Sequence, residues 1–203
     1  GCFDRIIHVH HWQLCILSYK ASVSLRGHRF MEDFHSIICW RDQLLIDSLT
    51  ALKDPDSEAW VRTAEACALT AGVMGGLGGA RCRTVAAHAV HNGLTQLEAC
   101  HHVLHGEKVG FGILVQLRLE ERLGGNRLAG QAHRQLLPLL RQLGLPVSLD
   151  DLGLAQASLS ELQEVCRFAC RDGSDLHHLP FAVTPGALLE ALVGAAELSP
   201  SSL

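Results

Sequence analysis

The sequence predicts an all-α protein over residues 46–203. From about residue 54 onwards, apolar residues recur at helical spacing, and glycine or proline separates the apolar runs. Leu, Ala, Gly and Arg dominate this part, and no alternating apolar pattern predicts a strand there. We therefore expect about seven helices packed as a bundle around one core.

Residues 1–45 form an atypical segment. Six of the seven isoleucines lie before residue 47, and seven of the ten aromatic residues lie at or before Trp60. Two interpretations are open: a separate small subdomain or edge segment, or a stretch foreign to the fold, such as a mispredicted exon, a frame error or a fusion scar. The chain starts with Gly1 rather than Met, which is typical of a fragment or a processed product.

The first helix of the main part is expected between Asp54 and Gly72. Asp54 is a preferred N-cap residue, Pro55 fits the first helical position, and Gly72 is a helix terminator. The glycine-rich stretch 72–79 lacks the order of a phosphate-binding loop and follows no strand. We interpret it as a flexible link between helices.

Two helices are expected around the histidines that follow. One runs through about His91 and ends at Asn92-Gly93, and the next runs from Thr95 to His105 and ends at Gly106. Each group of histidines would then lie near the end of a helix.

Four more helices complete the expected bundle. They are predicted at 109–123, 126–143, 158–171 and from Thr184-Pro185 to near a frayed tail at 199–203. Glycines at 124, 125 and 144 end the first two, and residues 145–153 form a connector. Ser158 and Glu161 have the spacing of a capping box, which marks the start of the third.

Composition excludes several classes of function. A hydrophobic share of 48% supports a packed core, while a net charge of −4 argues against a nucleic-acid partner and against a membrane surface. No uninterrupted apolar stretch reaches the ~18 residues of a membrane span. Eight scattered cysteines without zinc-ribbon spacing are interpreted as reduced core residues, which is typical of a cytoplasmic protein.

Five histidines within residues 88–105 are the strongest chemical signal. They are His88, His91, His101, His102 and His105. Imidazoles from two neighbouring helices can supply two corners of a tetrahedral Zn²⁺ site, or bind Fe²⁺. A carboxylate usually completes the protein ligands, and an alcohol in the open position loses its proton more easily and can then pass a hydride to a nicotinamide.

The spacing leaves the ligand pair open. His88 and His91 share a helix face, and His105 shares one with either His101 or His102. The alternative is that these are surface or helix-end histidines, favoured by the negative end of a helix dipole. Five histidines in one short segment favour metal binding.

Three weaker groups are interpreted as structural rather than chemical. They are His8, His10 and His11; Cys166 and Cys170 with His177 and His178; and Glu107 with Lys108. Cysteines one turn apart on an apolar helix face are typical of a core, and Glu-Lys after a glycine is typical of a helix start.

The segment resembles the C-terminal domain of glycerol dehydrogenases, in the iron-containing alcohol dehydrogenase superfamily with its dehydroquinate synthase-like fold. The resemblance rests on His-Ala-Val-His-Asn-Gly-Leu-Thr at 88–95 and His-His-Val-Leu-His-Gly-Glu-Lys-Val-Gly-Phe-Gly at 101–112. It continues through Leu-Gly-Leu-Pro-Val-Ser-Leu-Asp-Asp-Leu at 143–152 and Leu-Pro-Phe-Ala-Val-Thr at 179–184. It covers residues 60–203 well and 46–60 loosely.

The resemblance implies a two-domain enzyme with an NAD-binding α/β domain and a helical domain that holds Zn²⁺, the active site lying between them. By position in the motif, the two histidine ligands would be His88 and His105, with His88 also next to the substrate hydroxyls. The family's third ligand is an Asp in a Gly-x-Gly-Asp setting. Asp4 stands at about the right distance but in different surroundings, and Asp42 is too close. The NAD domain is absent from these residues, and the loop 75–84 is longer than the family's.

We therefore expect the metal-bearing half of a glycerol-type dehydrogenase, which oxidises a small polyol with NAD (glycerol to dihydroxyacetone) and is inactive alone. Zn²⁺ is the expected metal, with Fe²⁺ as the alternative. The expected partner is a second copy of the chain or a chain that carries the NAD domain. The rival interpretation is a non-catalytic remnant that binds metal or a partner. A zinc-dependent nucleic-acid module is disfavoured by the acidic charge.

Overall fold

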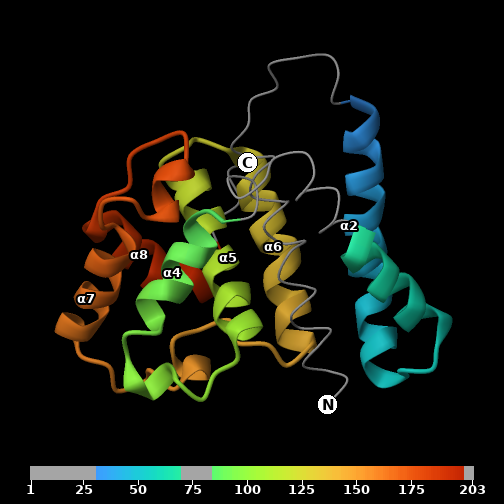
Figure 1. The fold of residues 1–203 in the computed structure, drawn as a ribbon, viewed down its shortest axis with the longest axis horizontal. Coiled ribbons are helices and arrows are strands. Elements are labelled where there is room, and N and C mark those ends of the chain that lie inside the picture. Colours follow the sequence, from blue (N-terminus) through green and yellow to red (C-terminus); the bar gives the residue numbers. More distant parts are fainter. Residues whose placement is uncertain (1–30, 70–83, 199–203) are drawn as a thin grey trace.

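The computed structural model describes residues 31–69 and 84–198, and every regular element in these two ranges is helical (Figure 1). The α-helices are α2 (Met31–Lys53), a helix over residues 58–69, α4 (Ala86–Leu94), α5 (His105–Arg122), α6 (Arg127–Gln142), α7 (Leu159–Ala169) and α8 (Pro185–Val193). Short 3₁₀ turns cover Glu98–Cys100, Asp150–Leu152, Asp175–His178 and Gly194–Ala196. The predicted all-α class is confirmed for these residues.

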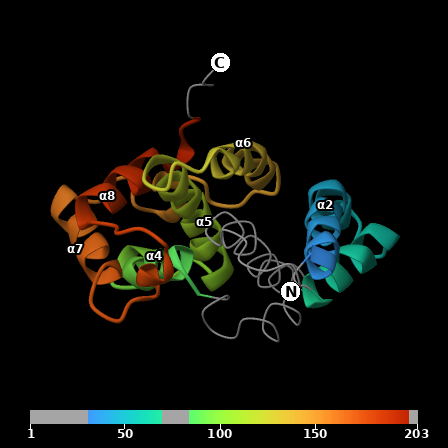
Figure 2. The same cartoon turned by 90° about the horizontal axis from the view of Figure 1, so that it is seen from above.

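Helix α5 is the centre of the bundle. It packs against α4, α6 and α8, and α7 covers α4 and α8 on the far side (Figures 1 and 2). Fourteen of its residues are buried, including Phe111, Ile113 and Leu117 at 0% exposure. The sequence predicts this apolar helix from residue 109, and the structure extends it back to His105.

Two glycines let α4 pack closely against its neighbours. A Cβ on Gly112 of α5 would lie 2.5 Å from the carbonyl oxygen of Ala87, and one on Gly93 of α4 would lie 2.6 Å from the carbonyl oxygen of Val165 in α7. The predicted helix end at Asn92-Gly93 agrees with the structure to within one residue, since α4 ends at Leu94. The missing side chain of Gly93 also makes room for α7.

The helix predicted from Thr95 to His105 is wrong. These residues form turns and the 3₁₀ segment Glu98–Cys100, after which α5 begins at His105. The Glu107 carboxylate accepts a hydrogen bond from the Leu104 N–H at 2.8 Å, and the Lys108 ammonium donates to the Cys100 carbonyl at 3.1 Å. These bonds cap α5 and close the preceding loop, so Gly106 lies in the first turn of a helix instead of ending one.

The later helix boundaries agree with the predicted caps. The Asn126 side chain accepts from the first turn of α6, Ser158 and Glu161 form the capping box of α7, and the Thr184 hydroxyl accepts from the Ala187 N–H at 3.2 Å. Gly125 follows α5 with a φ of 64°, and Gly144 follows α6 with a φ of 72°. Only glycine adopts such a left-handed backbone without strain.

Near residue 54 the helix starts later than expected. The Ser57 hydroxyl accepts from the Trp60 N–H at 3.2 Å and caps the helix over 58–69, while Asp54 and Pro55 lie in the turn before it. The Asp47 carboxylate holds the Arg62 guanidinium through Nε at 2.8 Å and Nη2 at 3.1 Å, which ties α2 to this helix.

Several predictions concern residues outside the described ranges. They are the third-ligand candidate Asp4, the histidines at 8, 10 and 11, the glycine-rich stretch 72–79 and the tail 199–203. The assignment of residues 1–45 to an atypical segment also stays a prediction, although α2 runs continuously across residue 45. Among the helices that the structure describes, none combines the length and apolarity needed to span a bilayer.

Candidate metal site

Three of the five histidines meet where α4 packs against the start of α5. His88 and His91 lie one turn apart on α4, and His105 is the first residue of α5. The ring centroids of His88 and His105 are 6.1 Å apart, and those of His91 and His105 are 4.2 Å apart. The other two histidines lie on the loop between the helices, where His101 Nε2 is 3.1 Å from the Thr95 carbonyl oxygen and both rings are exposed.

The location of His105 reverses one expectation from the sequence. Because no α-helix covers residues 95–104, His105 cannot share a helix face with His101 or His102. It also lies at the N-terminal, positive end of α5 rather than at the negative end of a preceding helix.

Short polar contacts connect two members of the imidazole cluster, which consists of His88, His91 and His105. His105 Nδ1 is 2.9 Å from His91 Nε2, and His91 Nδ1 is 3.0 Å from the side-chain oxygen of Asn92. Burial, together with the nearby His105, Lys108 and His88, lowers the pKa of His91 to about 4 in spite of the Asn92 hydrogen bond. His91 is therefore neutral at pH 7.

His88 and His105 fit two corners of a zinc site better than His91 and His105 do. Two imidazoles on one tetrahedral Zn²⁺ have nitrogens about 3.3 Å apart and ring centroids about 5 Å apart. The His88 and His105 rings are close to that separation and are tilted by 53°. The His91 and His105 nitrogens are 2.9 Å apart and face each other, so no ion fits between them.

The described residues do not supply a complete ligand set. Among the described side chains of residues 42–69 and 84–198, no three His, Cys, Asp or Glu gather closely enough to hold a metal ion.

The weaker group of Cys166, Cys170, His177 and His178 forms no shared site among the described residues. Cys166 is buried in the core, and burial, together with the neighbouring Cys170, raises the pKa of its thiol to about 12. His177 Nε2 lies 3.0 Å from the Arg171 carbonyl oxygen and His178 Nδ1 lies 2.8 Å from that of Thr84. The structural interpretation of these four residues agrees with this arrangement.

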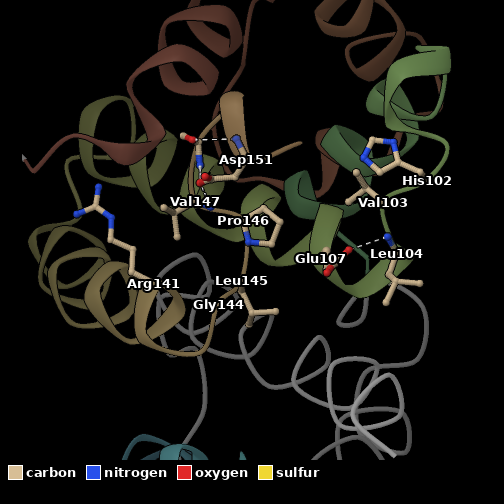
Figure 3. Close-up of a pocket in the computed structure, with 11 residues that line it drawn as sticks. His102, Val103, Leu104, Glu107, Arg141, Gly144, Leu145, Pro146, Val147 and Asp151 are labelled. Atoms are coloured by element: carbon tan, nitrogen blue, oxygen red, sulfur yellow. Dashed lines mark hydrogen bonds between the residues drawn. The ribbon is translucent and has the colours of Figure 1, made fainter. Parts of the chain in front are cut away.

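An open groove of about 770 Å³ lies between the loop before α5, the end of α6 and the connector that follows it (Figure 3). Three of its charged side chains are bound to backbone groups: Asp151 to the Val147 and Ser148 N–H groups, Glu107 to the Leu104 N–H, and Arg141 to the Ala196 carbonyl. These side chains stabilise the walls of the groove, so the imidazole cluster is the better candidate for chemistry.

Sequence reasoning missed two residues of the site. The Asn92 side chain contacts His91, although the sequence suggested only a helix terminator. Lys108 is 6% exposed, and the sequence suggested only a helix-start pair with Glu107. Glu107 does have the expected capping role. Lys108 shares a helix face with the buried Gly112 and Val115, and this spacing was the available signal.

No family model matches the chain. It is 59% identical over 153 residues to an uncharacterized oxidoreductase of Synechocystis sp., a match that covers 75% of this chain and 40% of that protein. It is 35% identical over 122 residues to the glycerol dehydrogenase of Citrobacter freundii (60% and 32% covered) and 32% identical over 172 residues to the glycolaldehyde reductase of Halobacterium salinarum (85% and 44%). The chain thus spans less than half the length of these relatives.

Two solved structures resemble this one. A structure described as a probable glycerol dehydrogenase, from Sinorhizobium meliloti, matches with a TM-score of 0.66 at 30% identity, over 80% of this chain and 44% of that one. The glycerol dehydrogenase of Schizosaccharomyces pombe matches with a TM-score of 0.70 over 95% of this chain and 48% of that one. At 24% identity the second match concerns the fold alone.

Proposed function

From the homology of this chain to part of the glycerol dehydrogenases of the iron-containing alcohol dehydrogenase family, we propose that it forms the metal-binding helical half of a polyol dehydrogenase. The observation that carries the proposal is the pair His88 and His105, whose ring centroids α4 and α5 bring to 6.1 Å from each other. These two side chains would hold Zn²⁺, or Fe²⁺.

The proposed reaction is the oxidation of a small vicinal diol such as glycerol to a hydroxyketone, with NAD as hydride acceptor. When bound, the metal would act as a Lewis acid that lowers the pKa of the substrate alcohol. On the resemblance, His88 would also lie next to the substrate hydroxyls. Its place on α4, in close contact with α5, keeps its backbone from moving away from His105.

The NAD-binding half and the third metal ligand are proposed to come from outside the described residues. An α/β domain, in the same polypeptide or in a second chain, would bind NAD and close the active site over the imidazole cluster. We propose that the 203-residue chain alone reduces no NAD. We also propose a cytoplasmic location, supported by the thiols of Cys100, Cys166 and Cys170, which form no disulfide.

The test is the metal content of the purified 203-residue chain, measured by elemental analysis. We expect about one zinc or iron per chain. The His88→Ala, His105→Ala double variant should lose the metal. The matched control is the His101→Ala, His102→Ala double variant, which removes two exposed histidines from the neighbouring loop and should keep it. Equal metal in both variants would contradict the proposed pair. No metal in the parent chain would mean that the third ligand is missing, and would favour a dehydrogenase remnant over a working metal site.

A further inference from the structure

The side chains of Asn92, His91 and His105 form a line of hydrogen bonds at the meeting point of α4 and α5. Asn92 Oδ1 lies 3.0 Å from His91 Nδ1, and His91 Nε2 lies 2.9 Å from His105 Nδ1. The backbone of Asn92 is itself anchored, since its carbonyl accepts from the Thr95 hydroxyl at 2.7 Å and from the Gln96 side-chain amide at 3.2 Å.

The chemistry of these atoms gives the line one direction. An amide oxygen only accepts, so His91 Nδ1 carries the hydrogen and donates it to Asn92. A neutral imidazole has one N–H, so His91 Nε2 is an acceptor and His105 Nδ1 must donate to it. The Nε2 atom of neutral His105 then carries a lone pair rather than a hydrogen.

We propose that Asn92 and His91 are positioning residues that hold His105 in its Nδ1–H tautomer, so that Nε2 is the nitrogen His105 offers to a metal ion. Neither residue is proposed to bind the metal. Ligating histidines commonly donate their second ring nitrogen to an oxygen acceptor that fixes ring orientation and tautomer. Here a second imidazole has that role, and an amide fixes the second imidazole in turn.

The tautomer is independent of any metal, whereas its use for ligation rests on the proposed function. The first experiment is therefore nitrogen-15 NMR of the imidazole rings in the metal-free chain at neutral pH, with the His105 signals assigned by their loss in His105→Ala. We expect a protonated Nδ1 and an unprotonated Nε2 on His105. In His91→Phe, which keeps a ring but removes the acceptor, His105 should lose this preference. The control His102→Phe makes the same change on the exposed loop and should leave His105 unaltered.

Variants of Asn92 provide the second arm if His91→Phe fails to fold. Asn92→Asp keeps an oxygen acceptor and should retain the Nδ1–H tautomer of His105. Asn92→Leu removes the acceptor, so His91 can adopt either tautomer and the preference of His105 for the Nδ1–H form should weaken. An Nε2–H tautomer in the parent chain, or an Nδ1–H tautomer that survives both His91→Phe and Asn92→Leu, would overturn the proposal.

The second measurement is Zn²⁺ affinity, from competition with a chromophoric chelator. Loss of a hydrogen-bond partner behind a ligand typically weakens metal binding about 10- to 100-fold. We expect a loss of this size in His91→Phe and Asn92→Leu, with affinity kept in His102→Phe and restored by Asn92→Asp. Unchanged affinity in the first two variants would overturn the role in ligation. A parent chain that shows the Nδ1–H tautomer but binds no Zn²⁺ would refute the proposed function and the ligating role, while the hydrogen-bond direction would stand.

Discussion

Replacement of Gly112 by alanine should separate α4 from α5 and destabilise the bundle. A Cβ at residue 112 would lie 2.5 Å from the carbonyl oxygen of Ala87, 3.1 Å from its Cα and 3.2 Å from its carbonyl carbon. All three atoms belong to the backbone of α4, so no side-chain rotation can relieve the overlap. The closest of these contacts must lengthen by about 0.9 Å to reach ordinary van der Waals distance, and the helices must move apart by a similar amount.

Two opposing effects decide the size of the change. Alanine in place of glycine inside a helix favours the folded state by about 1 kcal/mol. Overpacking of a well-packed core costs about 1–3 kcal/mol, and the upper end applies here because the obstacle is backbone. We therefore expect Gly112→Ala to lower the free energy of unfolding by about 2 kcal/mol.

Gly110 provides a matched control in the same helix. It is also buried, but a Cβ there would meet no heavy atom within 4 Å. Gly110→Ala should therefore show the propensity gain alone, a stabilisation of up to about 1 kcal/mol. The difference between the two variants isolates the close contact of α4 with α5 and should reach about 3 kcal/mol.

The assay is urea unfolding followed by circular dichroism, with midpoints compared at constant slope. The two midpoints should move in opposite directions. If Gly112→Ala were as stable as Gly110→Ala, the close approach of α4 and α5 in this structure would be refuted. Because His88 directly follows Ala87, Zn²⁺ affinity should fall in Gly112→Ala and stay unchanged in Gly110→Ala.

Two further predictions concern pH and thiol reactivity. Burial alone would raise the pKa of Asp151, but hydrogen bonds from Val147 and Ser148 hold that pKa below its ordinary value of 3.8. The ionised Asp151 therefore contributes its full stabilisation above about pH 4, and this stabilisation is lost as the pH falls through the lower native pKa. Asp151→Asn should therefore flatten the loss of stability in acid, measured by urea unfolding at several pH values, and an unchanged slope would contradict this. Burial raises the pKa of Cys166 to about 12, so mass spectrometry should find this thiol unlabelled by iodoacetamide at about pH 8 in the native chain and labelled in urea, and rapid native labelling would argue against its burial.

The helix boundaries that the sequence predicted correctly depend on local contacts. Asn126, Ser158 and Thr184 each accept a hydrogen bond from a backbone N–H two or three residues ahead, so the signal lies within one turn of sequence. The glycine at 144 has a left-handed backbone that other residues rarely adopt. Such helix boundaries can be predicted from the sequence because the hydrogen bonds that fix them involve no residue from a distant part of the chain.

The helix that was predicted wrongly depends on a neighbouring element. Residues 95–105 were expected to form a helix, yet the Lys108 ammonium on α5 donates to the carbonyl of Cys100, and these residues form turns instead. Such a contact outweighs local preference, because helix propensities differ by less than about 1 kcal/mol per residue.

The sequence by itself determined the all-helical class, the gathering of five histidines in one short segment and the resemblance to glycerol dehydrogenases, because residue types and their spacing carry that information directly. The sequence did not decide which pair of histidines would bind a metal ion. Only the tertiary structure placed His88 opposite His105 and put His91 behind His105 in a line that ends at Asn92. The distance between two imidazoles on different helices depends on how closely those helices pack, and here the missing side chain of Gly112 sets that approach.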